Sequence, residues 1–534
     1  MGAATFISRI MGLVREQVFA HLFGAGLAVD AFNIAFRIPN LLRDLFAEGA
    51  MSAALVPTFT RVREIRGKTQ SWVLAGRVFW TLGGLVSGIA VLGIIFSDSL
   101  VGLYAGAFRE TPGKFELAVQ LTQILFPFFP LVALAAAFMA VLNSLQVFFI
   151  PAFASALFNI VSVLTGVLGY WVCQSWGVEP IFGMAVGVVL GGLVQAIGQL
   201  PDLRRKRSED LRSEGFAVLP APATAWHQDL DLRAMIKLML PGTVGLAATQ
   251  VSILVNSILA TGAGPGAVSW LNYAFRLMQF PIGVFGVSWS QATLPRVSTQ
   301  WAKEDYSGAA ATLSSSLSQV FAINLPAAVG LAVLAEPLVS VLFEHGQFTA
   351  NDTIQTARAL AAYSVGLAAY SAVKVLVPSF YAFGDTRIPV ISSLASVGLT
   401  LILNVMSVKW LGFWGLALGT SIAAFLNLTY LLWAAARIVR QRGGVFSIRS
   451  VFWRFAVHLG VASGMGLACG LTWAWTGWAL GESIGMRAIW LLVLVFEGVI
   501  VASLIAWIFG VEESREVSQR LKSLLSRKFG KKTV

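Results

Sequence analysis

Charged residues are scarce in this sequence. Asp, Glu, Lys and Arg make up only 12% of its 534 residues, whereas soluble domains carry roughly 25%. Hydrophobic residues make up 57%, and apolar runs of about 20 residues, the length that crosses a hydrocarbon core, recur from one end of the chain to the other. These observations exclude a water-soluble globular protein and place nearly the whole chain in a membrane.

Cysteine and histidine are scarcer still, with two and four residues. Cys173 and Cys469 lie in apolar segments without a CxxC partner, and the histidines show no HxxxH spacing. This pattern argues against a disulfide framework, a zinc site and a cysteine nucleophile. We therefore expect no metal site, no cofactor and no catalytic residue.

The net charge of +12 comes mainly from short connections between apolar runs. Basic residues gather at 61–68, 204–207 and 437–449, whereas the connections 24–29 and 173–180 contain no Lys or Arg. The positive-inside rule makes the basic connections cytoplasmic. Topology therefore explains the basicity, so we expect no nucleic-acid partner. We predict a multi-pass protein of the bacterial inner membrane with both termini in the cytoplasm.

Fourteen segments are apolar and long enough to cross a membrane as helices. The sequence therefore predicts an all-α polytopic membrane protein with about fourteen transmembrane helices. The predicted helices span residues 3–24, 29–60, 73–97, 116–146, 151–174, 180–200, 233–261, 266–298, 309–334, 354–383, 387–409, 413–438, 450–475 and 486–510.

Two stretches of the chain resemble each other. FGAGLAVDAFNIAFR ends at Arg37, and TGAGPGAVSWLNYAFR ends at Arg276. Pro57 and Pro295 are 238 residues apart, as are Pro151 and Pro389. Because each copy holds six predicted helices, both copies enter the membrane in the same orientation. Transporters built from such repeats commonly bind substrate at the repeat interface.

The repeat predicts how the chain is divided. An N-terminal six-helix lobe covers 1–200, a cytoplasmic linker 201–232, and a C-terminal six-helix lobe 233–440. Two extra transmembrane helices over 450–510 lie outside the repeat. The basic cytoplasmic tail, 511–534, is expected to be either an amphipathic surface helix attracted to anionic lipid or a solvated tail.

Charges stand at membrane depth in the first two predicted helices, where each costs on the order of 3 kcal/mol unless it faces a cavity or a partner. The first helix contains Arg9, Arg15 and Glu16, and the second contains Arg43 together with a polar stripe of Asp30, Arg37, Asn40, Asp44 and Glu48. Pro39 interrupts this stripe, where it removes a helical hydrogen bond and is expected to kink the helix as a hinge.

The second lobe carries a counterpart to this charge. Arg276 is nearly alone in its helix, with Gln279 close by and Pro281, a second candidate hinge, after it. Guanidinium groups are permanently charged and match phosphate oxygens bidentately. Four arginines are therefore candidate ligands of a diphosphate: Arg9, Arg15, Arg43 and Arg276.

A structural role is the alternative. The arginines would pair with Glu16, Asp30, Asp44 and Glu48 to hold helices together, or would snorkel to an interface. Arg37 is a stronger candidate for such pairing because it shares a face with Asp30 and Asp44. Arginines in both lobes favour the binding role for the group as a whole.

The run SRIMGLVREQVFAHLFGAGLAVDAFNIAFRIPNLLRDLFAEGAMSAALVPTF, residues 8–59, closely resembles the signature of the MurJ (MviN) family of lipid II flippases. The similarity extends to YAFRLMQFPIGVFG at 273–286, FEHGQFTANDT at 343–353 and AYSVGLAAYSAVKVLVPSFYAFGDTRIPV at 362–390. The resemblance implies the multidrug/oligosaccharidyl-lipid/polysaccharide exporter fold, with two extra helices that form a groove for a lipid tail. It also implies movement of undecaprenyl-diphosphate-linked peptidoglycan precursor to the periplasmic leaflet.

The resemblance also assigns residues. The family's cavity arginines match Arg9, Arg15, Arg43 and Arg276, and its acidic positions match Glu16, Asp30 and Glu48. This sequence departs from related ones at Asp44, Phe275 and Gln279, where they often carry Arg, Asp and Glu. The resemblance therefore supports the phosphate-binding arginines more than a particular ion-pair network. We find no counterpart of the acidic sodium site ascribed to some members.

Two other classes of function remain open from the residues alone. One alternative is another exporter of the same fold, for drugs or for another polyprenyl-linked oligosaccharide. A drug antiporter should show a cation-coupling carboxylate and fewer cavity arginines. A membrane enzyme acting on polyprenyl phosphates needs clustered acidic or histidine groups near a membrane face. We expect a flippase and not an enzyme, acting as a monomer by alternating access. Its expected partners are lipid II and membrane lipids, with cell-wall synthesis proteins as candidates.

Overall fold

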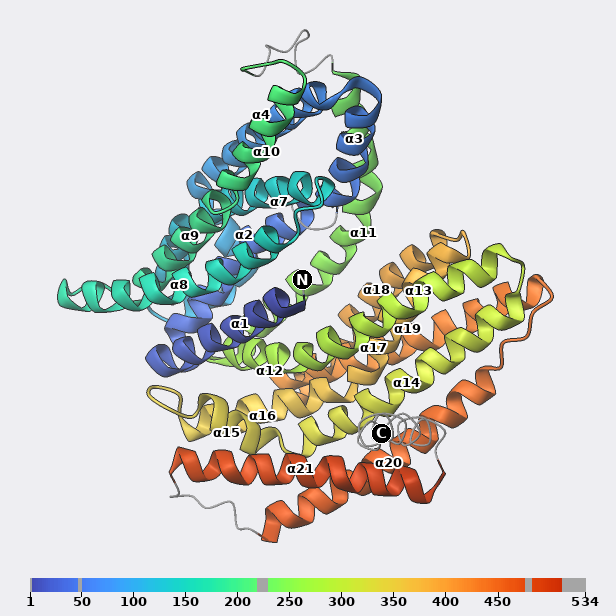
Figure 1. Ribbon diagram of the computed structural model, residues 1–534. Coiled ribbons are helices and arrows are strands. Elements are labelled where there is room, and N and C mark those ends of the chain that lie inside the picture. The colour runs from blue at the N-terminus through green and yellow to red at the C-terminus, as the bar shows by residue number, and fades with distance from the viewer. Residues whose placement is uncertain (1, 47–49, 219–228, 476–482, 511–534) are drawn as a thin grey trace, which may run out of the picture. The chain divides into compact units, whose positions relative to one another are not determined.

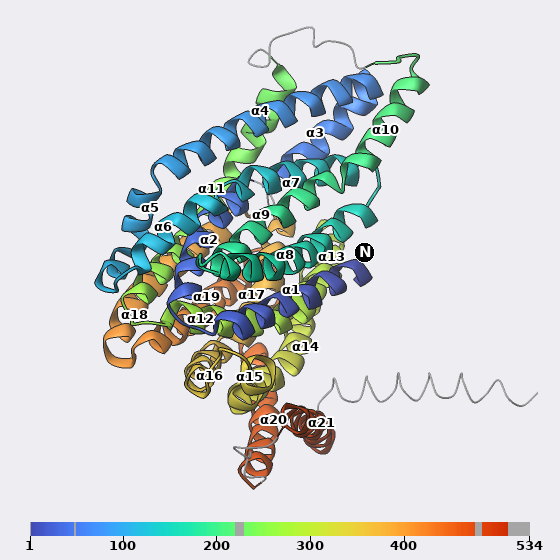
Figure 2. The same ribbon diagram turned by 90° about the vertical axis from the view of Figure 1, so that its left-hand side faces the viewer.

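The computed structural model describes residues 2–46, 50–218, 229–475 and 483–510. These residues form helices joined by short connections, with no β-strand among them (Figures 1 and 2). The chain divides into two compact units. Unit 1 comprises residues 1–269 and 345–348, and unit 2 comprises residues 270–344 and 349–534.

Unit 1 is built from the helices that precede the second copy of the repeat motif. They are α1 (Gly2–Phe23), α2 (Leu27–Phe46), α3 (Ala50–Arg66), α4 (Lys68–Ile95), α5 (Ser97–Ala105), a 3-10 turn (Gly106–Glu110), α6 (Lys114–Leu125), α7 (Phe128–Ser144), α8 (Phe149–Ser175), α9 (Ile181–Ile197), α10 (Leu200–Ser213) and α11 (Leu230–Thr261). We expected α11 to begin the second lobe, and the structure groups it with unit 1.

Unit 2 begins within the next helix. Its elements are α12 (Ala267–Pro281), a π-helical turn (Ile282–Gly286), α13 (Val287–Ala302), α14 (Tyr306–Val333), α15 (Ala335–Phe343), α16 (Ala350–Val365), α17 (Leu367–Ala382), α18 (Arg387–Leu411), α19 (Phe413–Gln441), α20 (Ile448–Trp475) and α21 (Ile484–Ile508). The helices α16 and α17 meet at an angle of 43°.

The predicted helix over 116–146 is broken into α6 and α7 in the structure. The break falls at Phe126–Pro127, because proline has no N–H to continue the helical ladder. The predicted helix over 29–60 corresponds to α2 and α3, and residues 47–49 between them lie outside the described residues. The structure also forms α5 where we predicted a connection.

Among the described helices, nine are long and apolar enough to cross a membrane, and the bent pair α16–α17 makes a tenth candidate. The multi-pass membrane fold is therefore confirmed, and the count is consistent with about fourteen spans. Neither α1 nor α2 is among the nine, and these are the helices that carry several charges.

Glycines bring α8 and α9 into close contact, and the two helices run side by side in both views (Figures 1 and 2). A Cβ added at Gly183 would stand 2.2 Å from the carbonyl carbon of Gly169, and one at Gly187 would stand 2.6 Å from the backbone of Gly166. Without a hydrophobic driving force in lipid, close backbone approach is what holds such helices together.

Carboxylates from the segment after α9 bind the basic turn between α3 and α4. Asp210 of α10 accepts hydrogen bonds from Nη2 of Arg63 (2.8 Å) and Nε1 of Trp72 (2.9 Å). Just beyond α10, Glu214 accepts from the first two backbone N–H groups of α4 (2.6 and 2.8 Å). This carboxylate therefore caps a helix to which it does not belong.

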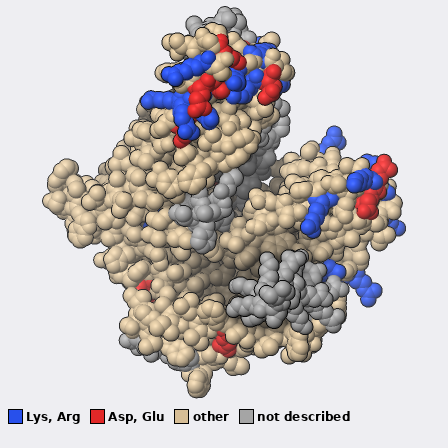
Figure 3. Space-filling view, viewed as in Figure 1, with Lys and Arg blue, Asp and Glu red and all other residues tan. Residues whose placement is uncertain are grey.

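The start of α11 adds two more carboxylates to this end of unit 1. Asp231 pairs with Arg61 (3.1 Å) and with Arg66 (2.5 Å), and Asp229 pairs with Arg77. We call the whole set the α10 clamp: Asp210, Glu214, Asp229 and Asp231 with Arg61, Arg63, Arg66 and Arg77. Figure 3 shows Lys and Arg side chains interleaved with Asp and Glu at this end of the unit.

Asp229 and Glu214 of the clamp have lowered pKa values. Burial by itself raises the pKa of Asp229, but hydrogen bonds from Arg77 and from backbone N–H groups outweigh it and lower the pKa below its ordinary value of 3.8. Hydrogen bonds from Thr69 and Lys68 lower the pKa of Glu214 below its ordinary 4.5. Both groups therefore stay ionised at neutral pH.

Candidate functional site

Arg15 of α1 is the first candidate arginine that the structure describes in full. Its Nη2 donates to Oε1 of the adjacent Glu16 at 3.0 Å, and each side chain is only 11% exposed. The guanidinium carbon also lies 5.7 Å from the ring centre of Phe158 on α8. Since a guanidinium has five N–H donors, the bond to Glu16 leaves this group able to donate to a phosphate as well.

Arg43 of α2 has a similar neighbour. Its Nη2 and Nε donate to Oδ1 of Asp44 at 2.7 and 3.1 Å. The other oxygen, Oδ2, accepts from Nε2 of Gln250 on α11 at 3.0 Å. The position where related sequences often carry a second arginine therefore holds a carboxylate that orients Arg43 and ties α2 to α11.

Asp30 has a fully buried environment of its own. It forms an ion pair with Nζ of Lys114 at the start of α6 (2.8 Å), and both side chains are nearly inaccessible to solvent. It also accepts hydrogen bonds from the backbone N–H groups of Gly266 and Ser269 and from the Ser269 hydroxyl, at 2.7, 2.9 and 2.6 Å. Such a satisfied carboxylate holds α2, α6 and the segment 266–269 together.

The other residues of the α2 stripe are less enclosed. Arg37 and Asn40 are half-buried, and the helix runs through the buried Pro39 from Leu27 to Phe46. The hinge role of Pro39 stays a prediction. The side chain of Arg9 and the whole of Glu48 lie outside the described residues.

In unit 2, the candidates stand at the end of α12. Arg276 and Gln279 are exposed. Pro281 is the last residue of α12, and the π-helical turn Ile282–Gly286 follows it directly. π-helical turns often occur at functional sites in helices, and the hinge role of Pro281 stays a prediction.

The structure thus brings Arg15 against Glu16 and Arg43 against Asp44, and it gives Asp30 a lysine partner. Sequence reasoning missed Lys114 and Gln250, which lie 84 and 206 residues away from their partners. The only sequence signal for Lys114 was a basic residue just before an apolar helix. Arg276 belongs to the other unit, so convergence of the four arginines stays a prediction.

The described part of the chain is helical, and many of its helices are long and apolar enough to span a membrane. Two further helices, α1 and α2, carry buried charges. These features define a multi-pass membrane transporter. The family model described as lipid II flippase MurJ matches residues 19–510. The chain belongs to this family.

Relatives and solved structures agree with that assignment. The chain is 34% identical to the probable lipid II flippase MurJ of Vibrio cholerae, covering 93% of each chain, and 34% identical to the lipid II flippase MurJ of Burkholderia cenocepacia, covering 89% of each. A structure of lipid II flippase MurJ in an inward closed conformation matches with a TM-score of 0.77 at 25% identity, covering 95% of this chain and 98% of that one.

More distant structures share the fold. An inward-facing transporter of the multidrug resistance MATE family, in the MOP superfamily, matches with a TM-score of 0.68 at 16% identity. It covers 81% of this chain and 96% of its own. This likeness confirms the predicted exporter fold and carries no statement about substrate.

Proposed function

We propose that this protein is a lipid II flippase, which moves undecaprenyl-diphosphate-linked peptidoglycan precursor from the cytoplasmic to the periplasmic leaflet by alternating access. The observation that carries the proposal is the pair of mostly buried guanidiniums, Arg15 and Arg43, within a chain that matches the family over residues 19–510. A permanently charged guanidinium at membrane depth suits a diphosphate, which remains ionised throughout transport.

The arginines have distinct surroundings under this proposal. Glu16 and Asp44 fix the planes of Arg15 and Arg43 while the remaining N–H groups of Arg15 donate to phosphate oxygens. Arg276 supplies a cation from unit 2, and Arg9 a further one from α1. The lobes move about Pro39 and Pro281 as the diphosphate crosses.

The last two helices hold the polyprenyl tail in this proposal. Several apolar side chains of α21 are exposed, among them Ile489, Leu492 and Phe496 at 57%, 58% and 66%. These side chains provide an apolar surface against which an isoprenoid chain can lie. The protein acts as a monomer, and cell-wall synthesis proteins are candidate partners.

The test is lipid II translocation in proteoliposomes, measured from the accessibility of labelled lipid II in each leaflet. Arg15→Ala and Arg276→Ala are each expected to lower the rate by about tenfold or more, because a charge-assisted contact to phosphate is worth roughly 1.5–3 kcal/mol. Arg15→Lys keeps the positive charge but loses the planar set of guanidinium N–H donors. It is expected to recover part of the translocation rate.

Arg109→Ala is the matched control. Arg109 is 61% exposed and lies 3.8 Å from the exposed Asp98, so its loss is expected to leave translocation unchanged. Wild-type rates in well-folded Arg15→Ala and Arg276→Ala proteins would remove the arginines from the mechanism. Transport of drug cations with no movement of lipid II would instead favour an exporter of another substrate.

Orientation has a separate test. Because the basic connections are proposed to be cytoplasmic, Ser175 at the end of α8 faces the periplasm and Ser208 in α10 faces the cytoplasm. In a variant with Cys173 and Cys469 replaced by Ser, a membrane-impermeant thiol reagent should label Ser175→Cys in intact cells. It should label Ser208→Cys only after permeabilisation, and the reverse pattern would invert the topology.

A further inference from the structure

A short segment of the second repeat packs in the first unit. Residues 345–348, which we call the strap, belong to unit 1, whereas Glu344 before them and Thr349 after them belong to unit 2. The 238-residue spacing of the repeat places residues 107–110 at the equivalent position. These residues form part of the 3-10 turn of unit 1, so the first copy of this segment stays in its own unit.

The strap docks on the end of α1. The backbone N–H of Gln347 donates to the carbonyl oxygen of His21 at 2.9 Å. The rings of His21 and His345 meet edge to face, with their centres 5.4 Å apart. His21 follows Arg15 on the same helix by about 9 Å along the axis. The strap therefore holds the end of a helix that carries a candidate diphosphate ligand.

Two glycines make this approach possible. Gly24, just after α1, and Gly346 of the strap both have a φ of +64°, a conformation that favours glycine. A Cβ added at Gly24 would overlap the carbonyl oxygen of Gln347, and one at Gly346 would overlap the carbonyl oxygen of His21. Backbone therefore meets backbone, and a side chain at either glycine would push the strap away from α1.

Both ends of the strap are fixed in unit 2. Glu344 pairs with Arg487 at the start of α21 (3.0 Å) and accepts a hydrogen bond from Oγ1 of Thr353 (2.9 Å). On the other side, the backbone N–H of Thr349 donates to Oδ2 of Asp352 (2.9 Å) in the capping box that begins α16. The strap must therefore follow unit 2 at its ends, whatever its middle contacts.

The contact between the strap and α1 is suited to release. Gly346, Gln347 and His21 are exposed, so water can replace the hydrogen bond between the two backbones. The junction of Asp30 with the segment 266–269 is the opposite case. Separating it would leave a fully buried carboxylate without its N–H donors. The first contact can open at low cost, and the second cannot.

We propose that the strap is a releasable latch, which holds the end of α1 in this conformation and leaves it once in each transport cycle while its ends stay with unit 2. The proposal rests on the proposed alternating access, in which the two lobes move against each other. In the orientation proposed above, the connection 24–29 is periplasmic. Release of the strap therefore frees the periplasmic end of α1 as the diphosphate leaves Arg15.

The first test bridges the strap to α1. In the cysteine-free background of the topology test, His21→Cys/His345→Cys is treated with a short bis-methanethiosulfonate reagent, and lipid II translocation is measured in proteoliposomes. The bridge is expected to lower the rate by about tenfold or more, because it blocks a conformational step of the cycle. Reduction of the bridge should restore the rate.

Asn351→Cys/Gln355→Cys is the matched control for the bridge. The native side chains lie one turn apart on α16, at 3.4 Å, close to the strap in the chain. A bridge within one helix does not restrain the strap, so it is expected to change the rate less than about twofold.

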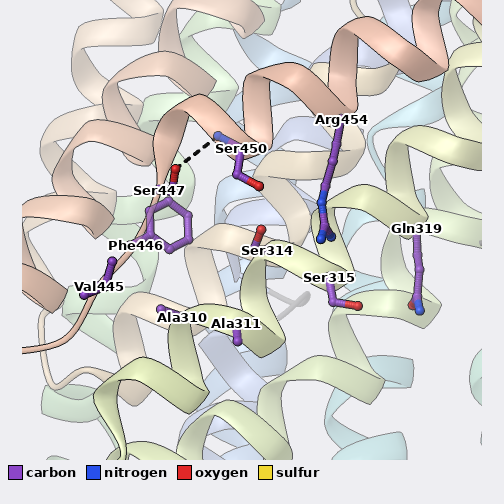
Figure 4. Close-up of a pocket in the computed structure, with 10 residues that line it drawn as sticks. All are labelled: Ala310, Ala311, Ser314, Ser315, Gln319, Val445, Phe446, Ser447, Ser450 and Arg454. Atoms are coloured by element: carbon purple, nitrogen blue, oxygen red, sulfur yellow. Dashed lines mark hydrogen bonds between the residues drawn. The ribbon is translucent and has the colours of Figure 1, made fainter. Parts of the chain in front are cut away.

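A polar cavity in unit 2 lies at the far end of α14 from the strap. It has a volume of about 310 Å³ and lies between α14 and the start of α20, where Ser314, Gln319 and Arg454 are among the lining residues (Figure 4). From Gln319, α14 continues for about 20 Å to Val333 before the chain enters α15. A reagent bound at the strap therefore does not fill this cavity.

The second test follows the strap directly by pulsed electron paramagnetic resonance. Spin labels on Ser175→Cys, at the end of α8, and on Gln347→Cys should give one distance in the free protein and a second, longer distance when lipid II is added. Labels on Ser175→Cys and His21→Cys are the control and should give a single distance, because α8 and α1 pack together within unit 1.

A pair of glycine variants separates docking from backbone strain. Gly346→Ala is expected to populate the longer distance without lipid II, because its Cβ would overlap His21. Gly113→Ala should leave the strap docked, since Gly113 has a similar φ of +76° but nothing within 4 Å of an added Cβ. Failure of the unbridged protein to move lipid II would overturn the proposed function. Transport that survives the bridge, or a single distance from Ser175 to Gln347 in protein that transports, would overturn the strap proposal alone.

Discussion

The two units differ in the charges that they carry at equivalent positions of the repeat. In unit 1, Asp210 and Glu214 reach back to the α3–α4 turn, so that basic groups are bound by the chain's own carboxylates. In unit 2, the equivalent segment from residue 440 to residue 454 carries Arg440, Arg442 and Arg449 and contains no Asp or Glu. The repeat has therefore preserved the order of helices without preserving their charge. One copy binds its basic groups with its own carboxylates, whereas the equivalent segment of the other copy carries basic residues alone.

The largest effect is expected when the α10 clamp is broken at its buried centre. In Asp210→Asn, Arg63 loses its ion pair while both side chains remain largely buried, at 21% and 10% exposure. We expect the free energy of unfolding to fall by about 2 kcal/mol, measured as a lower melting temperature in detergent. Asp202→Asn is the control, because its partner Arg205 is 61% exposed and the loss should stay below about 0.5 kcal/mol. Equal shifts in both variants would mean that the clamp adds no stability.

The N-terminal caps of α4 and α14 also differ between the two units. The N-terminus of α14 is capped from its own turn, where Oδ1 of Asp305 accepts from the backbone N–H of Gly308 at 2.8 Å. Asp305→Ala is expected to lower the free energy of unfolding by about 1 kcal/mol. Glu214→Ala, which removes the exposed cap of α4, should cost less. Thermal unfolding of the two variants compares them directly, and a larger loss for Glu214→Ala would contradict the expected order.

The smallest expected effect is that of mild acid on the clamp. The folded pKa values of Asp229 and Glu214 lie below their ordinary values of 3.8 and 4.5. The stability they contribute is therefore present above the ordinary values and is lost only as pH falls through the lowered ones. Melting temperature should stay constant between about pH 7 and 5.5 and fall below about pH 4. A fall that begins near pH 6 would point to histidine instead.

The fold was largely predictable because membrane helices are encoded locally. Each spanning helix must satisfy its backbone internally and hide about 20 residues from water, so apolar run length reveals it. The break at Phe126–Pro127 and the short α5 were missed because apolar composition continues across them. Pro127 was a local signal for the first of these irregularities.

The candidate site was predictable only in part. The costly charges of α1 and α2 identified Arg15, Arg43 and Asp30 as important positions. Their partners could not be predicted from the sequence. Lys114 and Gln250 are 84 and 206 residues away from their partners in the chain and approach them only through tertiary packing. The spacing of residues along a helix predicts which side chains share a face. It does not predict which residues of other helices contact that face.

The glycine contacts between α8 and α9 have a mechanical consequence. With the backbones touching at Gly169 and Gly183, there is no layer of side chains to shear, so neither helix can slide or roll against the other without a steric clash. We therefore expect α8 and α9 to move as one rigid body during any transport cycle. We expect flexing at irregular points of the helices instead, such as the π-helical turn that follows Pro281.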